Sequence, residues 1–254
     1  NALPQDFRQV LAGVAVIGQN TTRGELDYLL IPLLDSARLR IILERLVEGR
    51  FLSYNRQTRT YSLHPIDRDY ALSGIPQGSS DDDEQAFTRY RLHNHMAEYY
   101  KSRRKAESEW KSLDDLAPQL SEMEHLYAIG DYDGVGAILA VIDFNYLIKW
   151  GYNDLSLLWL TRVEGKISDP NIAIICIGNW GAVYRYIGDT KTAILYSQRA
   201  LDMARQYGNK KQEARNLNNL ANGYATLGQV ETSIQYYHEG LIIAREANNK
   251  TTEA

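Results

Sequence analysis

Cysteine is nearly absent from this chain of 254 residues, because Cys176 is the only one. A single cysteine excludes an intramolecular disulfide and favours a reducing setting, so we expect a cytoplasmic protein. No apolar run approaches the roughly 18 to 20 residues that a membrane span needs, which indicates no contact with a membrane. The formal net charge is −4, so no basic surplus draws the whole chain toward nucleic acid.

Residue patterns that carry chemistry are also missing. The sequence contains no Gly-x-x-x-x-Gly-Lys-Ser/Thr phosphate loop, and the stretch from Gly188 to Thr192 lacks both the leading glycine and a preceding strand. The five histidines lack metal-ligand spacing; His93 and His95 stand two apart on a predicted helix and should point to different faces. We therefore predict no catalytic residue, no metal site and no cofactor within this chain.

One segment near the C-terminus is written twice. The stretch from Asn179 to Tyr184 aligns with the stretch from Asn219 to Tyr224. The same offset of 40 places Gly188 on Gly228, Ile194 on Ile234, Leu201 on Leu241 and Ala204-Arg205 on Ala244-Arg245. Self-similarity at a fixed period of this size predicts a solenoid of stacked units.

Each unit of this repeat is predicted to be a pair of helices. A small residue faces an aromatic on the first helix, a glycine permits the reversal, and apolar residues recur at helical spacing on the second. The first copy resembles the tetratricopeptide repeat (TPR), on the residues Gly181, Tyr184, Gly188, Ala193 and Ala200-Leu201. The second copy departs from the pattern at Ser233 and Gly240. We expect TPR repeats over 170–254, truncated because the next unit would open at Glu253-Ala254.

The N-terminal part predicts three helices followed by a β-hairpin. The first helix spans 4–19, the second is capped by Thr21 or Thr22, and the third begins at Asp35 or Ser36 and ends at Gly49. Predicted strands at 51–54 and 60–63 flank a polar turn, and a short helix follows over 66–75. This order is that of a winged helix. The predicted fold is therefore mainly α, with a winged-helix domain over 1–75 followed by an α-helical TPR-like solenoid.

The predicted winged helix is compatible with two functions, of which DNA binding is the first. The third helix would enter the major groove with Arg38, Arg40 and Arg45, and the hairpin would add Arg56 and Arg59. Acidic residues are mixed throughout this region, and apolar residues occupy much of the third helix, so its phosphate-binding stripe is thin. DNA therefore stays the less favoured partner.

The second function comes from the stretch Leu63 to Leu72. It resembles the Met/Leu-His-Asp motif, and the helix after it, that close the winged-helix domain of STAND signal-transduction NTPases of the NB-ARC type. Leu63-His64 match the motif, Pro65 replaces its Asp, and Ile66, Arg68, Asp69 and Ala71 match the helix. The resemblance implies that His64 contacts the β-phosphate of ADP held by an intramolecular nucleotide-binding domain missing from this chain. In the alternative, His64 only caps the hairpin or the helix.

Between these regions we predict a linker over 76–84, made of turn formers and an acidic run. Residues 85–169 are predicted to form irregular helical pairs that join the winged helix to the repeats, beginning with a long helix over 85–107. Such a helical segment between winged helix and repeats is common in STAND proteins, so the order supports that resemblance.

The inner face of the solenoid is the predicted binding site. Asparagine side chains there can pair with both the N–H and the C=O groups of an extended partner, or can instead bridge neighbouring helices. The predicted groove residues are Asn179, Arg185, Tyr186, Arg215, Asn218, Asn219 and Asn222. The leading hypothesis is a regulatory and sensor fragment of a STAND-type ATPase whose repeats bind a protein or peptide trigger and whose full-length form binds ADP or ATP. The alternatives are a transcription regulator with TPRs and a plain TPR adaptor.

Overall fold

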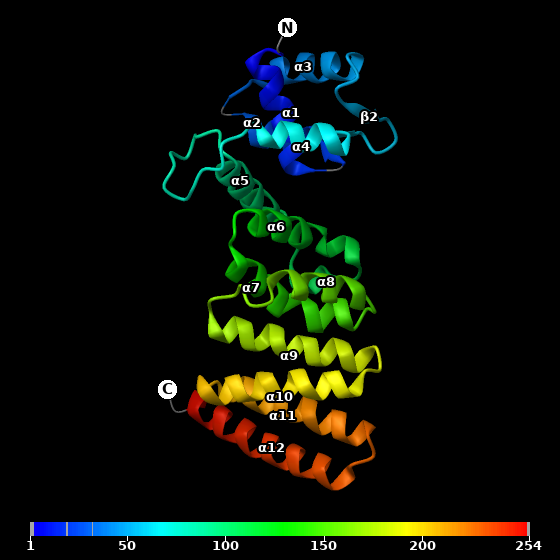
Figure 1. Ribbon diagram of the computed structural model, residues 1–254, viewed down its shortest axis with the longest axis vertical. Coiled ribbons are helices and arrows are strands. Elements are labelled where there is room, and N and C mark those ends of the chain that lie inside the picture. Colours follow the sequence, from blue (N-terminus) through cyan, green and yellow to red (C-terminus); the bar gives the residue numbers. More distant parts are fainter. Residues whose placement is uncertain (1–2, 19, 32, 253–254) are drawn as a thin grey trace. The chain divides into compact units, whose positions relative to one another are not determined.

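The computed structural model of the chain describes residues 3–18, 20–31 and 33–252, and for 248–252 it describes the backbone alone. The fold is mainly helical and divides into two compact units, 1–130 and 131–254 (Figure 1). Residues 253–254, where we expected a further repeat to open, lie outside the described part. Each unit is considered by itself below.

The first unit begins with the predicted helices and hairpin. Its elements are α1 (Gln5–Ile17), β1 (Thr21–Thr22), α2 (Arg23–Leu30), α3 (Ser36–Glu48), β2 (Ser53–Asn55), β3 (Thr60–Ser62) and α4 (Pro65–Ser73). Thr22 caps α2 in a reciprocal capping box with Glu25, and the Asp35 carboxylate caps α3 by accepting from the Arg38 N–H. Three helices followed by a β-hairpin are therefore confirmed.

The sheet differs from the prediction in two ways. It has a third strand, β1, which pairs antiparallel with β3, so the strand order is β1-β3-β2. The hairpin is also shorter at its start, because the amides of Phe51 and Leu52 both donate to the Leu46 carbonyl, at 2.9 and 3.2 Å, and so finish α3. A strand of two residues is too short to show the alternation from which strands are predicted.

The core of this part is formed by α1, α2 and α3, with Val10, Leu26 and Ile42 fully buried. Helix α3 buries one stripe, Leu39, Ile42, Leu43 and Leu46. Its other side is exposed and carries Arg38, Arg40 and Arg45. Ile41 shares this exposed side and is 38% exposed, so apolar residues lie on both sides of the helix.

The first unit continues with α5 (Arg89–Ser102), the short 3₁₀ turns η1 (Glu107–Glu109) and η2 (Leu113–Leu116), and α6 (Ala117–Ala128). The predicted helix over 85–107 is thus shorter at both ends. Its start is set by Thr88, whose hydroxyl accepts from the Arg91 N–H. Helices α5 and α6 pack on each other, and α5 also packs on α1 and α2.

The second unit is a stack of helices. Its elements are α7 (Tyr132–Ile142), the π-helical turn η3 (Asp143–Ile148), α8 (Asn153–Val163), α9 (Pro170–Tyr186), α10 (Thr190–Gln206), α11 (Lys210–Thr226) and α12 (Val230–Thr252). The pairs α9–α10 and α11–α12 are the two predicted repeats (Figure 1). Before them, α7 and α8, joined through η3, pack on α9, although the 40-residue period does not extend to them.

Small residues bring neighbouring helices close together, both within a repeat and between the two repeats. A Cβ on Gly181 would lie 2.5 Å from the Ser197 Oγ, and one on Gly223 would lie 2.6 Å from Ile194. Gly188 and Gly228 turn the chain with φ of 91° and 75°, as predicted. Ser233, at a position where the pattern has alanine, is buried and donates from its Oγ to the Ala221 carbonyl at 2.9 Å, which satisfies the hydroxyl.

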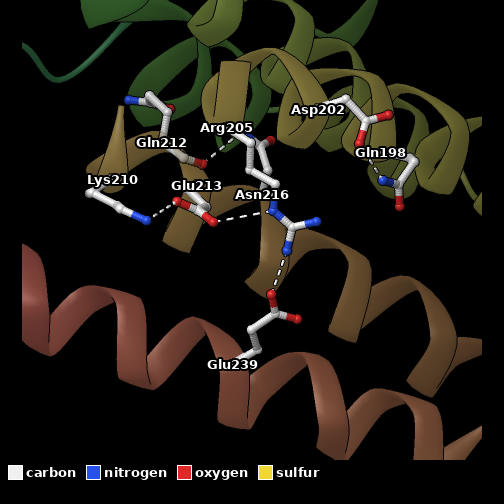
Figure 2. Close-up of polar contacts among 8 residues, drawn as sticks. All are labelled: Gln198, Asp202, Arg205, Lys210, Gln212, Glu213, Asn216 and Glu239. Carbon is white, nitrogen blue, oxygen red and sulfur yellow. Dashed lines mark hydrogen bonds and ion pairs between the residues drawn. The ribbon is translucent and has the colours of Figure 1, made fainter. Parts of the chain in front are cut away.

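An ion-pair cluster centred on Arg205 links the two repeats. Figure 2 shows the Arg205 guanidinium, from α10, between the carboxylates of Glu213 on α11 and Glu239 on α12. Glu213 is 5% exposed and also accepts from Lys210 at 2.9 Å, so its buried charge has two cationic partners. The cluster therefore connects α10, α11 and α12, and the two cations avoid the cost of leaving the Glu213 carboxylate buried without a partner.

Candidate functional site

The predicted groove residues come together on α9 and α11, but they differ in what they can offer a ligand. Asn179 is fully buried, and its Oδ1 accepts from the Arg215 guanidinium at 2.7 Å. The Arg215 side chain also lies over the Phe144 ring, 5.1 Å from its centre. In this structure, Asn179 and Arg215 therefore contact each other and η3.

A buried acid lies beside this pair. Asp143, the first residue of η3, is fully buried, and neither of its carboxylate oxygens has a hydrogen-bond partner with good geometry among the described residues. Burial raises the pKa of Asp143 to about 6, although the Ser156 hydroxyl, the Asn179 amide and the charge of Arg215 pull it down. Burial also lowers the pKa of Arg215, with Asp143 opposing the shift.

This acid was missed in the sequence. It stands in the apolar run Val141-Ile142-Asp143-Phe144, inside the region 85–169 that we predict to form irregular helical pairs. A lone acid within such a run is a signal of a buried charge, because a solvated acid normally has polar neighbours. The π-helical turn could not be predicted from spacing, since it inserts one residue into the helical register.

The α11 asparagines are partly used within the fold. Asn222 donates from Nδ2 to the Asn218 carbonyl at 2.8 Å and accepts at Oδ1 from the Tyr237 hydroxyl at 2.8 Å. It therefore bridges α11 to α12. Asn219 is half-buried, and its Nδ2 is enclosed without a hydrogen-bond partner among the described residues, whereas the Asn218 side chain is exposed. Asn218 thus keeps its side-chain amide accessible to a ligand.

Arg185 and Tyr186 lie at the C-terminal end of α9. The Arg185 guanidinium stacks on the Tyr186 ring at 4.7 Å, and its Nε is buried without a hydrogen-bond partner among the described residues. Tyr186 is 46% exposed. A cation laid on an exposed aromatic ring is a suitable contact surface for a peptide, because it offers both apolar area and hydrogen-bond donors.

His64 lies at the other predicted site, in the first unit. It is the N-cap residue of α4, and its Nδ1 accepts from the Ile66 N–H at 3.4 Å. The imidazole is exposed. Next to it, Gly18, Leu63, Pro65, Arg68 and Asp69 line a small pocket. The Nδ1 atom of His64 therefore caps α4, and its Nε2 atom takes no part in that cap.

The other histidines of the first unit form contacts inside it. His93 and His125 face each other with 2.8 Å between their Nδ1 atoms, and burial lowers the pKa of His93 to about 4 and that of His125 to about 3. His95 packs instead on Tyr28, so the two rings do point to different faces. No group of three or more metal-ligating side chains occurs among the described residues.

Comparison with known families decides the nature of the repeats. Residues 173–247 match the family model of the tetratricopeptide repeat. The TPR prediction is thus confirmed for α9 to α12, and TPR stacks serve as surfaces for protein–protein interaction. The match covers less than half of the chain. No helix in the described part of the chain has both the length and the apolar character to cross a membrane.

A solved structure with a similar arrangement is titled as a Signal Transduction ATPase with Numerous Domains (STAND) protein with a tetratricopeptide repeat sensor from Pyrococcus horikoshii. Sequence identity is 15% and the TM-score is 0.41; the match covers 98% of this chain and 52% of that one. The chain therefore spans about half the length of that protein. A search of curated proteins found no match.

Proposed function

We propose that this chain is the sensor and regulatory part of a STAND-type signal-transduction ATPase. In this proposal α1 to α4 with the hairpin are a winged helix that contacts a nucleotide-binding domain outside residues 1–254. That domain binds ADP or ATP, and this chain contributes no catalytic residue. The TPR repeats bind a protein or peptide trigger in the cytoplasm.

The observation that carries the regulatory half is the state of His64. Because Nδ1 accepts a hydrogen bond from the Ile66 N–H, the neutral ring carries its proton on Nε2. The ring is exposed at the N-terminal end of α4, where the helix dipole favours an anion. An Nε2–H donor beside a helix N-terminus suits a phosphate oxygen. Pro65, in place of the motif's Asp, supplies no carboxylate to orient that ring.

Two substitutions separate the capping role from the phosphate role. His64→Asn keeps an N-cap acceptor but removes the Nε2–H donor, whereas His64→Ala removes both. In the protein that includes the nucleotide-binding domain, we expect both variants to release bound ADP faster than wild type. Only His64→Ala should also lower thermal stability. If His64→Asn retains ADP as well as wild type does, His64 is a cap and the sensor role is wrong.

The sensor half rests on the groove residues that remain free. Asn218 and Tyr186 are exposed, whereas Asn179 is fully buried. A trigger can act only through different affinities for the resting and active states. We expect Tyr186→Ala to reduce trigger-stimulated ATP hydrolysis by the full-length protein, with Leu195→Ala, on an exposed part of α10, as the control. Equal loss in both variants would contradict the groove assignment.

The DNA-binding alternative is disfavoured by the partners of the α3 cations. Arg38 forms an ion pair with Asp6, and the Arg40 Nε lies 4.0 Å from the Glu44 carboxylate. Two of the three arginines are therefore already next to an acid, which reduces their attraction for phosphate. We expect no shift of duplex DNA by the chain at moderate salt; a salt-dependent shift would favour the transcription-regulator function instead.

A further inference from the structure

The helices of the two repeats differ in where their acidic residues stand. Helix α9 has no aspartate or glutamate between Pro170 and Tyr186. Helix α11 has one, Glu213, whose carboxylate is paired with Arg205 and Lys210 (Figure 2). The outer helices α10 and α12 carry the acids Asp202, Glu231, Glu239 and Glu246. Acidic side chains are thus concentrated on the helices that do not carry the predicted groove residues.

Helix α11 carries a polar stripe without acids. Lys211, Arg215, Asn218 and Asn222 follow one another at intervals of four, three and four residues, so they lie along one side of the helix. Lys211 and Asn218 are exposed, and the other two are half-buried. Helix α9, which ends near Arg185, packs beside α11. The four α11 residues together with Arg185 are called the polar face below.

The polar face holds cations without acidic partners. Glu213 pairs with Lys210 and not with Lys211, and the Arg185 Nε has no hydrogen-bond partner among the described residues. Neither Lys211 nor Arg185 forms an ion pair within that part of the chain. An unpaired cation near the surface attracts an anion from solution, so the polar face favours a negatively charged partner.

The acids that adjoin these helices do not cancel this charge. Asp143 of η3 acts on Arg215, but it is fully buried, so a ligand in solution does not reach it. Asp169, the N-cap residue of α9, uses its carboxylate to accept from the amides of Asn171 and Ile172. The positive charge of Lys211 and Arg185 is therefore presented to a partner.

The length of the polar face suits a short extended peptide. Lys211 and Asn222 are 11 residues apart, which is about 16 Å along α11 at a rise of 1.5 Å per residue. An extended chain covers this distance in about five residues. The exposed Asn218 amide can bond to the backbone of such a chain, while Lys211 and Arg185 can donate to its carboxylates.

We propose that the polar face binds an extended peptide rich in aspartate and glutamate that belongs to the trigger protein. This rests on the sensor role proposed above for the repeats, and it names the chemical class of their partner. A basic segment would meet Lys211 and Arg185 with no accessible acid to pair with, and an apolar segment would cover these cations without pairing them. Both are therefore disfavoured.

An array of short random-sequence peptides, graded in net charge and probed with the full chain, tests the class of ligand. We expect the bound peptides to be acidic. Replacing their Glu by Gln should weaken binding by about tenfold or more, and added salt should weaken it further. Bound peptides that are neutral or basic would overturn the acidic class. The array involves no nucleotide, so this failure is separate from that of the His64 test.

Matched charge reversals locate the site. Lys211→Glu should weaken binding of the selected acidic peptides by about tenfold or more, whereas Lys191→Glu should leave it unchanged. Both lysines are exposed and both substitutions change the net charge equally, but Lys191 lies on α10. Circular dichroism checks that both variants are folded. Equal loss in both would show attraction to net charge alone and would overturn the polar face as the site. If no peptide binds, this proposal and the sensor half of the proposed function are both wrong.

Discussion

Leu201 and Leu241 occupy the same position in successive repeats but have different surroundings, and this pair provides a matched test of the stacking. Leu201 is fully buried between α10 and α11, whereas Leu241 on α12 is 48% exposed. Truncation of both to alanine removes the same three carbon atoms. Any difference in the cost must therefore come from the environment.

The magnitudes follow from burial. Leu201→Ala loses the full transfer free energy of its side chain and leaves a cavity against Leu217 and Leu220, for a total of about 3 kcal/mol within the usual range of about 2–5 kcal/mol. Leu241→Ala loses only about half the transfer term and leaves no closed cavity, so about 1 kcal/mol or less is expected. With a urea m-value of about 2 kcal/mol per molar, the midpoints should differ by roughly 1 M.

The assay is urea unfolding followed by tryptophan fluorescence, since Trp150, Trp159 and Trp180 belong to the second unit and only Trp110 to the first. Equal midpoint shifts for Leu201→Ala and Leu241→Ala would refute the assignment of α12 as a helix with one open face.

Three further predictions concern the buried charges and the tight helix contact. Because the pKa of Asp143 is raised to about 6 in the folded state, the free energy of unfolding should fall as pH rises from about 4 through 6. Asp143→Asn should remove this decrease and raise the free energy of unfolding at pH 8 by roughly 2 kcal/mol, as measured by denaturation across pH. Burial, with the nearby charge of Arg68, lowers the pKa values of His93 and His125, so the unfolded state binds protons at a higher pH than the folded state does. The free energy of unfolding should therefore fall as pH falls from about 6.5 toward 4. This fall should be smaller in His125→Gln than in wild type, and unchanged in the control variant His238→Gln, whose histidine is exposed. Gly181→Ala should destabilise by about 1–3 kcal/mol in thermal melts, because its Cβ would clash with Ser197 and lie 3.1 Å from the Ala193 carbonyl; an unchanged melting temperature would contradict the packing described.

The repeats could be predicted because their information is local and occurs twice. Gly181, Gly188 and Leu201 recur in kind or position 40 residues later, and each does in the structure what its residue type predicts: close approach, reversal and burial. The N-terminal helices α2 and α3 were predictable from local signals alone, through caps at Thr22 and Asp35, and the hairpin was predictable from its polar turn. The assignment of functional roles to His64 and the groove residues stays a prediction.

Only the tertiary structure decided which of the predicted groove residues remain free. Asn179 and Asn219 are repeat equivalents, yet Asn179 is fully buried with its Oδ1 accepting from Arg215, whereas Asn219 is only half-buried. Asn222 contacts Tyr237, a residue 15 positions further along. Sequence periodicity specifies which face of a helix a residue lies on, but the neighbour across that face depends on how whole helices stack, and that contact is made by residues far apart in the chain.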